Sequence, residues 1–260
     1  MRGTYFLGNG EFETRDMPVR PLGPHDVRIQ VAACGVCGTD VHICHGDKGS
    51  AAVTSPVVLG HELAGTVVEL GTDVTTLQIG DHVSVDPNSY CGQCHSCRSG
   101  KKQLCTALHA IGVNEDGGFA EYCTAPEQQC YRLSPQISLE YGALAEPLAC
   151  CLHGIDRAQI RTGDTVLVIG GGAIGLLLVQ LSKLSGAAKV LLSEPVTVRR
   201  EVGLQLGASA AIDPVHEDLN ARIRELTGVD GVDVVIECVG NTAATAQAFA
   251  AAKRGTTLLL

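Results

Sequence analysis

The chain has 260 residues, of which 45% are hydrophobic, and a formal net charge of −9; this length suffices for two ordinary globular domains, each with its own buried core. Its 19 lysines and arginines are scattered, so the chain offers no basic stripe to neutralise phosphates, and a nucleic acid is not expected as a partner. No apolar run approaches the roughly 20 residues of a membrane helix, so we expect neither a membrane span nor a membrane partner.

The first part of the chain, up to about residue 150, has the pattern of antiparallel β-structure. Short runs of alternating apolar residues are separated by turns, and strands are predicted at 27–31, 65–70 and 82–85. Strands of this kind fold as a barrel or a sandwich.

Three potential metal ligands are spread over this part of the chain. Cys37 and His61 each have an ordinary alternative, as a small core residue and as a hydrogen-bonded histidine. Glu146 interrupts an apolar stretch, and a buried carboxylate needs a partner. Together, a thiol, an imidazole and a carboxylate can hold zinc and leave a fourth position open, as a catalytic site requires.

A loop in the same part contains four cysteines in the spacing C-x2-C-x2-C-x7-C. Disulfides or unrelated thiols are the alternatives, but gaps of two residues are typical of zinc loops, and four thiolates leave no coordination position open. We therefore predict a structural zinc in a lobe at about residues 88–108, held by Cys91, Cys94, Cys97 and Cys105. Twelve cysteines in a chain with no recognisable secretory leader also predict a reducing, cytoplasmic compartment.

From Thr162 onward the pattern changes to alternating strands and helices, which predicts a parallel, doubly wound α/β sheet. The expected strands lie near residues 165–170, 188–193, 210–212, 232–238 and 256–260. Helices are expected between them, including 174–184, 199–206 and 219–226. A doubly wound fold usually has six strands, so the pattern predicts a sheet that is truncated after five.

The first of these strands leads into a glycine-rich turn that matches G-x-G-x-x-G. Such a turn lets backbone amides and a helix N-terminus face a pyrophosphate, and its residues are Gly170, Gly172, Ala173, Ile174 and Gly175. Glu194 ends the second strand, where a carboxylate can accept hydrogen bonds from the adenosine ribose, although a solvated strand end is the alternative. The acid favours NAD over NADP, whereas Arg199 and Arg200 could pair with a 2′-phosphate.

These motifs occur in the order found in zinc-dependent medium-chain alcohol and polyol dehydrogenases, which the chain resembles over nearly its whole length. The strings are Cys37-Gly38-Thr39-Asp40, Gly60-His61-Glu62, the four-cysteine loop, Glu146-Pro147-Leu148 and the glycine turn. Glu-Pro-Leu makes it most similar to the sorbitol dehydrogenase branch. The resemblance implies a GroES-like β-barrel domain over residues 1–152 and an incomplete NAD-binding Rossmann domain over 153–260.

The same resemblance implies an enzyme that transfers hydride from a secondary alcohol, polyol or vicinal diol to NAD and gives a ketone. It implies two zinc ions per chain. Cys37, His61 and Glu146 would hold the catalytic zinc, with Glu62 as an alternate or water-bridged ligand. Thr39 would contact the reacting oxygen, and His42 would be the outer end of a proton relay. Thr39, Ile43 and Phe119 are expected to line a pocket for the small-molecule substrate.

Other functions stay open from the sequence alone. The chain could be an inactive fragment that keeps the structural zinc and nucleotide binding, or an enzyme like L-threonine 3-dehydrogenase. A zinc-independent reductase of the same superfamily is disfavoured by the set of Cys37, His61 and Glu146. A homo-oligomer is expected if the protein is full length.

Overall fold

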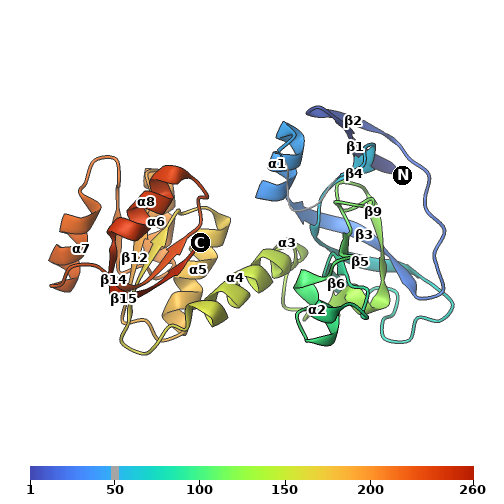
Figure 1. Ribbon diagram of the computed structural model, residues 1–260. Helices are drawn as coiled ribbons and strands as arrows, with labels where there is room; N and C mark the ends of the chain where they lie inside the picture. Colours follow the sequence, from blue (N-terminus) through green and yellow to red (C-terminus); the bar gives the residue numbers. More distant parts are fainter. Residues whose placement is uncertain (48–52) are drawn as a thin grey trace. The chain divides into compact units, whose positions relative to one another are not determined.

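The computed structural model describes residues 1–47 and 53–260 and divides into two compact units, Met1–Glu146 and Pro147–Leu260 (Figure 1). The division lies near the start of helix α4 (Ala145–Ala158), and the domain boundary expected after residue 152 falls within the same helix. Among the helices of the described residues, none is long and apolar enough to cross a membrane.

The first unit is built on a five-stranded antiparallel sheet, in the order β10-β6-β5-β3-β9. The predicted strands are confirmed, and two of them, β3 and β5, are longer than expected, because their pairing continues to Gly35 opposite Glu62. Val27, Ile29 and Leu63 are fully buried in the core of this unit. The strands are β3 (Asp26–Gly35), β5 (Glu62–Leu70), β6 (His82–Val85), β9 (Tyr122–Pro126) and β10 (Cys130–Arg132).

A smaller sheet, in the order β2-β1-β4, contains a hairpin that the sequence analysis did not predict. Its turn is Asn9-Gly10, and both residues have positive φ, as a two-residue hairpin loop requires. Helix α1 (Gly38–His45) packs its buried Ile43 with Phe6 of this sheet. The strands are β1 (Arg2–Gly8), β2 (Glu11–Asp16) and β4 (Val57–Val58).

Short elements complete the first unit. They are β7 (Asn88–Ser89), α2 (His95–Arg98), η1 (Lys102–Leu104), β8 (His109–Ala110), η2 (Glu127–Gln129) and α3 (Leu139–Gly142).

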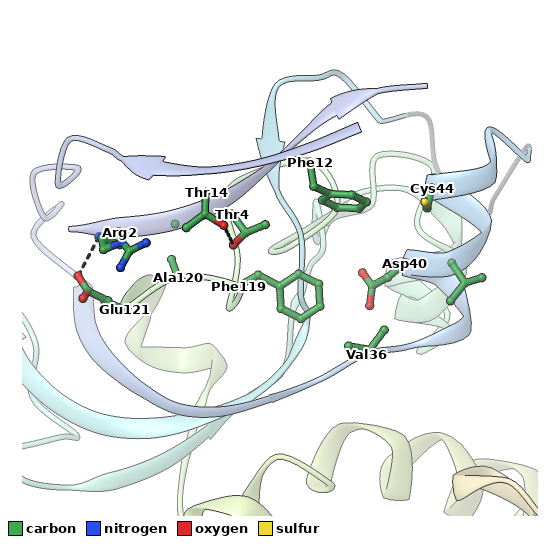
Figure 2. Close-up of a pocket in the computed structure, with 12 residues that line it drawn as sticks. Arg2, Thr4, Phe12, Thr14, Val36, Asp40, Cys44, Phe119, Ala120 and Glu121 are labelled. Atoms are coloured by element: carbon green, nitrogen blue, oxygen red, sulfur yellow. Dashed lines mark hydrogen bonds between the residues drawn. The ribbon is translucent and has the colours of Figure 1, made fainter. Parts of the chain in front are cut away.

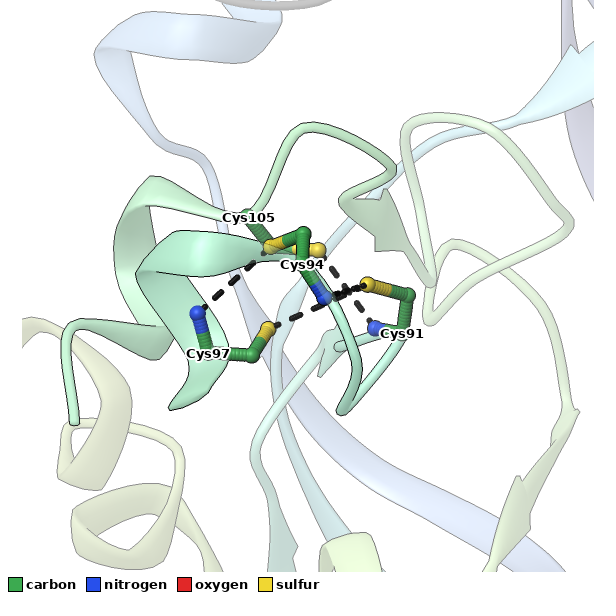
Figure 3. A group of neighbouring side chains, drawn as sticks. All are labelled: Cys91, Cys94, Cys97 and Cys105. Atoms are coloured by element: carbon green, nitrogen blue, oxygen red, sulfur yellow. Dashed lines mark hydrogen bonds between the residues drawn. The ribbon is translucent and has the colours of Figure 1, made fainter. Parts of the chain in front are cut away.

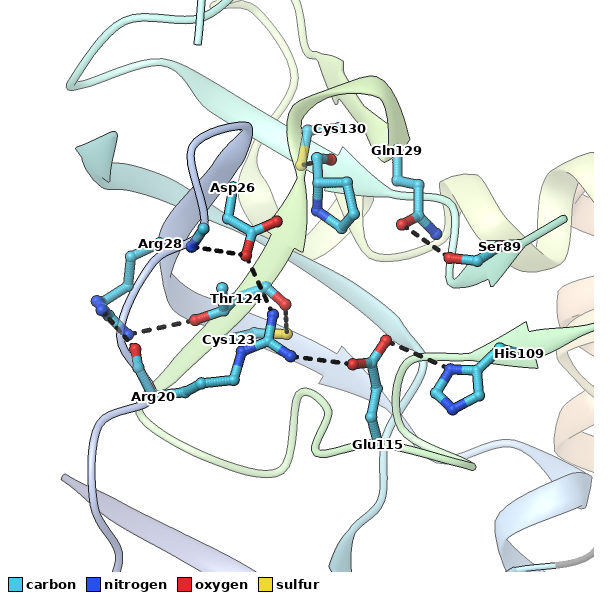
Figure 4. A network of polar contacts seen from close by, with 12 residues as sticks. Arg20, Asp26, Arg28, Ser89, His109, Glu115, Cys123, Thr124, Gln129 and Cys130 are labelled. Carbon is cyan, nitrogen blue, oxygen red and sulfur yellow. Dashed lines mark hydrogen bonds and ion pairs between the residues drawn. The ribbon is translucent and has the colours of Figure 1, made fainter. Parts of the chain in front are cut away.

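A buried arginine ties several of the first unit's strands together (Figure 4). Arg28 is 7% exposed; it donates to Glu69 Oε2 at 2.7 Å, to Thr124 Oγ1 at 3.2 Å and to the Arg20 carbonyl at 2.9 Å. Arg20 in turn reaches Glu115 Oε2 at 3.2 Å. A buried guanidinium is tolerated only when its donors are used in this way.

The second unit is a parallel sheet in the order β13-β12-β11-β14-β15, which confirms the doubly wound prediction. The first four strands match expectation to within a residue at each end, but β15 begins earlier than expected. The strands are β11 (Thr165–Ile169), β12 (Lys189–Ser193), β13 (Ala210–Ile212), β14 (Val232–Glu237) and β15 (Ala252–Leu259). The helices after α4 are α5 (Ala173–Leu184), α6 (Thr197–Gln205), α7 (Leu219–Thr227) and α8 (Thr242–Ala250).

Strand alternation distributes the apolar residues of this unit over both faces of its sheet. Val166 and Val168 of β11 belong to a core cluster with α4 and α5, whereas Leu167 and Ile169 belong to a second cluster with α7 and α8. Both faces are therefore covered, as a parallel sheet requires, and the carboxyl end of β11 leads directly into the glycine turn.

Candidate zinc and nucleotide sites

The four predicted zinc cysteines converge in one lobe of the first unit, which we call the cysteine lobe (Figure 3). Cys94 caps α2, which places Cys97 one turn later, and Cys105 follows η1. One sulfur from each of the four cysteines lies within 4.8 Å of the others. The sulfurs of Cys91 and Cys97 are 4.0 Å apart, close to the separation of about 3.8 Å for thiolates on a tetrahedral zinc with bonds of about 2.3 Å. The donor set thus fits a structural zinc.

Backbone amides point at the sulfurs of this lobe. Cys94 N–H donates to Cys91 Sγ at 3.3 Å, and Cys91 N–H donates to Cys105 Sγ at 3.4 Å. The bond from Cys97 N–H lowers the pKa of the Cys94 thiol to about 6, whereas burial raises the pKa of Cys97 to about 12. Amide donors of this kind stabilise thiolates and support metal-bound cysteines.

Polar contacts attach the base of the lobe to the barrel (Figure 4). Ser89 Oγ donates to Gln129 Oε1 at 3.2 Å, and Gln129 Nε2 donates to the Asp86 carbonyl at 2.9 Å. At the other end of the lobe, His109 Nδ1 lies 3.6 Å from Glu115 Oε1. The lobe is therefore held at both of its ends.

A second group of donors gathers where α1 and β5 begin; we call Cys37, His61 and Glu62 the Cys37 cluster. The pairing of β3 with β5 places Glu62 opposite Gly35, two residues before Cys37. One ligand atom from each member lies within 4.8 Å of the others. His61 and Glu62 are 7% and 9% exposed, so these donors are shielded from bulk water.

Asp40 forms a buried pair with His61 beside this cluster. Asp40 Oδ2 accepts the Cys37 backbone N–H at 2.8 Å, and Asp40 Oδ1 faces His61 Nδ1 at 3.7 Å. Burial opposes a charge on His61, but the hydrogen bond with Cys37 and the charges on Asp40, Cys37 and Glu146 raise its pKa to about 8. A histidine whose Nδ1 faces a carboxylate keeps Nε2 available for a cation, so this pair fits a metal-binding histidine.

Of the remaining candidates of the predicted catalytic site, Thr39 and Glu146 lie near this cluster and His42 lies on the surface of α1. Thr39 Oγ1 is 3.7 Å from Cys37 Sγ, and Glu146 is near enough to act electrostatically on His61. His42 is 64% exposed on α1, and its Nδ1 lies 3.0 Å from Asp47 Oδ2. The sequence analysis did not single out Asp47, because nothing in its spacing marks it as a partner of His42.

A cavity of about 770 Å³ opens beside α1 (Figure 2). Its wall is mostly apolar and includes Phe12, Val41 and Phe119, with Arg2 and Glu121 among its few charged residues, and Asp40 joins the wall to the Cys37 cluster. Phe119 was expected at a substrate pocket and lies here. Ile43 was also expected there, but it is 6% exposed and packs in the core instead.

The glycine turn of the second unit has the shape that a dinucleotide phosphate site needs. Gly170 has a φ of 99°, and a Cβ on Gly175 would lie 1.8 Å from the Gly170 carbonyl oxygen. A Cβ on Gly172 would meet nothing within 4 Å, so the space before α5 is open. The first amides of α5, at Ala173 and Ile174, have no acceptor within the helix. The turn therefore fits a pyrophosphate.

Glu194 lies directly beside this turn. It is 3% exposed; its Oε2 accepts the Gly171 N–H at 2.6 Å and its Oε1 accepts the Val196 N–H at 2.8 Å. Arg199 Nη1 is 4.0 Å from Glu194 Oε2, and this arginine is 56% exposed. Arg200 points inward, with Asp213 Oδ2 at 3.1 Å. Arg199 is thus the arginine of the two that is open to a ligand.

A closed four-thiolate lobe, a mixed donor cluster and a dinucleotide turn on a doubly wound sheet define a zinc-dependent dehydrogenase that uses a nicotinamide coenzyme. Known families agree with this class. The alcohol dehydrogenase GroES-like domain matches residues 23–135, and the zinc-binding dehydrogenase family matches residues 173–260. The chain belongs to the zinc-dependent medium-chain alcohol and polyol dehydrogenases.

Individual relatives cover nearly the whole chain. L-threonine 3-dehydrogenase of Pyrococcus horikoshii is 38% identical over 240 residues, which are 92% of this chain and 69% of that protein. Sorbitol dehydrogenase of Halalkalibacterium halodurans is 38% identical over 255 residues, 97% of this chain and 71% of that protein. A structure described as a zinc-binding dehydrogenase from Sinorhizobium meliloti 1021, bound to NADP, is 42% identical with a TM-score of 0.93, covering 99% of this chain and 75% of that one.

Proposed function

We propose that this chain oxidises a secondary alcohol of a polyol or vicinal diol to a ketone, with zinc held by Cys37, His61 and a carboxylate and with NAD as coenzyme. The observation that carries the proposal is the convergence of a thiol, an imidazole and a carboxylate within 4.8 Å beside the buried Asp40. Three protein donors leave a position for substrate, which distinguishes this cluster from the cysteine lobe.

Two carboxylates compete for the third ligand position. Glu62 belongs to the group within 4.8 Å, and Glu146 acts on His61 electrostatically. The resemblance to the sorbitol dehydrogenase branch favours Glu146, with Glu62 as the alternate ligand. The two carboxylates differ in how they reach the cluster, since Glu62 arrives with the β3–β5 pairing and Glu146 with the start of α4.

When bound, zinc acts as a Lewis acid that favours loss of the alcohol proton, and nicotinamide accepts the hydride. Side chains of the protein bind the substrate hydroxyl and transfer its proton. Thr39, beside Cys37, holds the substrate hydroxyl and hands on its proton. His42, exposed on the same helix, takes that proton and releases it to solvent. Asp40, whose Oδ1 faces His61 Nδ1, would leave Nε2 of His61 available to hold the zinc.

Glu194 supports NAD as the preferred coenzyme, since a carboxylate beside the adenosine ribose repels a 2′-phosphate. Exposed Arg199 acts in the opposite direction. The relative from Sinorhizobium meliloti was solved with NADP, so we expect a preference rather than an absolute requirement.

An L-threonine 3-dehydrogenase activity is the second candidate, because relatives with that name match this chain as well as the sorbitol dehydrogenase does, at 38% identity. Sorbitol and L-threonine both carry a secondary hydroxyl next to a carbon with a polar substituent. The charges on L-threonine, which polyols lack, would decide between the two activities.

Metal analysis and a substrate panel test the proposal. We expect about two zinc ions per chain and reduction of NAD with sorbitol, xylitol or butane-2,3-diol, and L-threonine serves as the competing substrate. A higher kcat/KM for L-threonine would favour the second candidate. One zinc ion per chain together with no turnover on any of these substrates would contradict the proposal and favour a binding fragment.

A further inference from the structure

The end of helix α1 brings Asp47 back onto His42 through the backbone. Gly46 has a φ of 75°, its N–H donates to the Ile43 carbonyl, and Asp47 N–H donates to the His42 carbonyl at 2.9 Å. These two bonds form a Schellman motif, which sets the residue after the glycine against the residue five positions earlier. The position of Asp47 beside His42 is therefore fixed by the fold.

The side chains of the same two residues also meet. His42 Nδ1 lies 3.0 Å from Asp47 Oδ2. A carboxylate accepts hydrogen bonds only, so the ring must carry its proton on Nδ1, and Nε2 of the neutral imidazole is left with a free lone pair.

We infer that Asp47 is a positioning residue for proton transfer through His42. It holds the imidazole in the tautomer whose Nε2 accepts the proton released during alcohol oxidation. This inference rests on the relay role proposed for His42. The proton leaves the substrate hydroxyl through Thr39, binds His42 Nε2 to give the imidazolium and passes from there to water, while the hydride goes to nicotinamide.

The contact between the His42 and Asp47 side chains contributes little to the stability of the fold. The side chains of His42 and Asp47 are 64% and 57% exposed, and exposed ion pairs contribute little to folding. The Schellman bond of Asp47 comes from its backbone and survives a change of side chain. A loss of turnover on removing the Asp47 carboxylate would therefore report on the imidazole and not on the fold.

Nitrogen NMR of histidine-labelled protein tests the tautomer directly, without turnover. We expect His42 to carry its proton on Nδ1 in the wild-type protein at alkaline pH and to shift toward the Nε2–H form in Asp47→Ala. His45, exposed on the same helix, should be unchanged between the two proteins. An unaltered His42 tautomer in Asp47→Ala would overturn the inference.

The turnover of variants distinguishes the positioning role of Asp47 from the relay role of His42, on which it rests. We expect His42→Gln and Asp47→Ala each to lower kcat about tenfold with little change in KM for the coenzyme, and the double variant to lose no more than either. Asp47→Glu should recover part of the rate, and His45→Gln should match wild type. A normal rate in Asp47→Ala beside a slow His42→Gln would refute the role of Asp47, whereas a normal rate in His42→Gln would refute the relay itself.

Discussion

The cysteine lobe and the Cys37 cluster are assembled in opposite ways. The lobe takes its four donors from one short segment, residues 91–105, whose turns and amide bonds arrange the sulfurs locally. The Cys37 cluster takes its donors from residue 37 and from residues 61–62, which meet only because β3 pairs with β5. A closed set of four thiolates is typical of a zinc site that stabilises the fold, whereas a mixed donor set with a free coordination position is typical of a catalytic zinc site.

The sharpest test of this division is Cys37→Ser. Loss of the thiolate should lower kcat/KM by at least about a thousandfold, roughly 4 kcal/mol of transition-state stabilisation, because the zinc is lost or misplaced. Thermal unfolding should stay close to that of the wild type. Cys130→Ser, in the same unit but outside both the cluster and the lining of the cavity, is the matched control and should keep most of its activity.

The converse substitution is Cys97→Ser in the lobe. Removing one of four thiolates weakens a site whose binding energy contributes to folding, so we expect a loss of about 3 kcal/mol in the free energy of unfolding, measured in denaturant. Residual soluble protein should keep its catalytic zinc. Cys130→Ser removes a non-ligand thiol of the same unit and should cost much less. If Cys37→Ser and Cys97→Ser caused the same purely catalytic defect, the distinction between the two sites would be wrong.

Glutamine at either carboxylate identifies the third ligand of the open site. With Glu146 as the favoured ligand, Glu146→Gln should lower activity about a hundredfold and reduce zinc occupancy at this site, while Glu62→Gln, at the alternate ligand, should cost about tenfold. Zinc content after dialysis checks the assignment, and exposed Glu140→Gln is the control. The reverse order of effects would make Glu62 the ligand.

The same contrast explains what the sequence could predict. The lobe and the glycine turn follow from short spacings, because each is shaped by backbone within a few residues. The clustering of Glu62 with Cys37 depends on the register of β3 against β5, in which Gly35 faces Glu62. The spacing of residues along the chain does not predict the register of two paired strands.

The features that the sequence analysis missed also depend on structure that short spacings do not reveal. The β1–β2 hairpin had a usable signal in Asn9-Gly10, but β2 is exposed throughout and lacks apolar alternation. Strand β15 begins at Ala252 although Lys253, Arg254 and Gly255 resemble a turn, since an irregularity in its pairing with β14 accommodates them. Asp47 escaped notice because a Schellman motif, rather than a sequence motif, places it.

The nucleotide turn is intermediate between the cysteine lobe and the Cys37 cluster, because its glycines are close in sequence and its acid, Glu194, is distant. Substitutions at this turn should have the smallest effects. Glu194→Gln should narrow the preference for NADH over NADPH about tenfold, because the carboxylate no longer repels a 2′-phosphate.

Arg199→Ala should widen the preference for NADH over NADPH about threefold by removing the exposed guanidinium near that position. Binding of both reduced coenzymes, followed by their fluorescence, measures these ratios without substrate. Arg200→Ala is unsuitable as a control because it breaks a largely buried ion pair with Asp213. Arg224→Ala on α7 is the better control, because its ion pair with Asp230 is exposed and contributes little to folding. Equal changes in both affinities for Glu194→Gln would mean that this acid only holds the Gly171 amide and does not select the coenzyme.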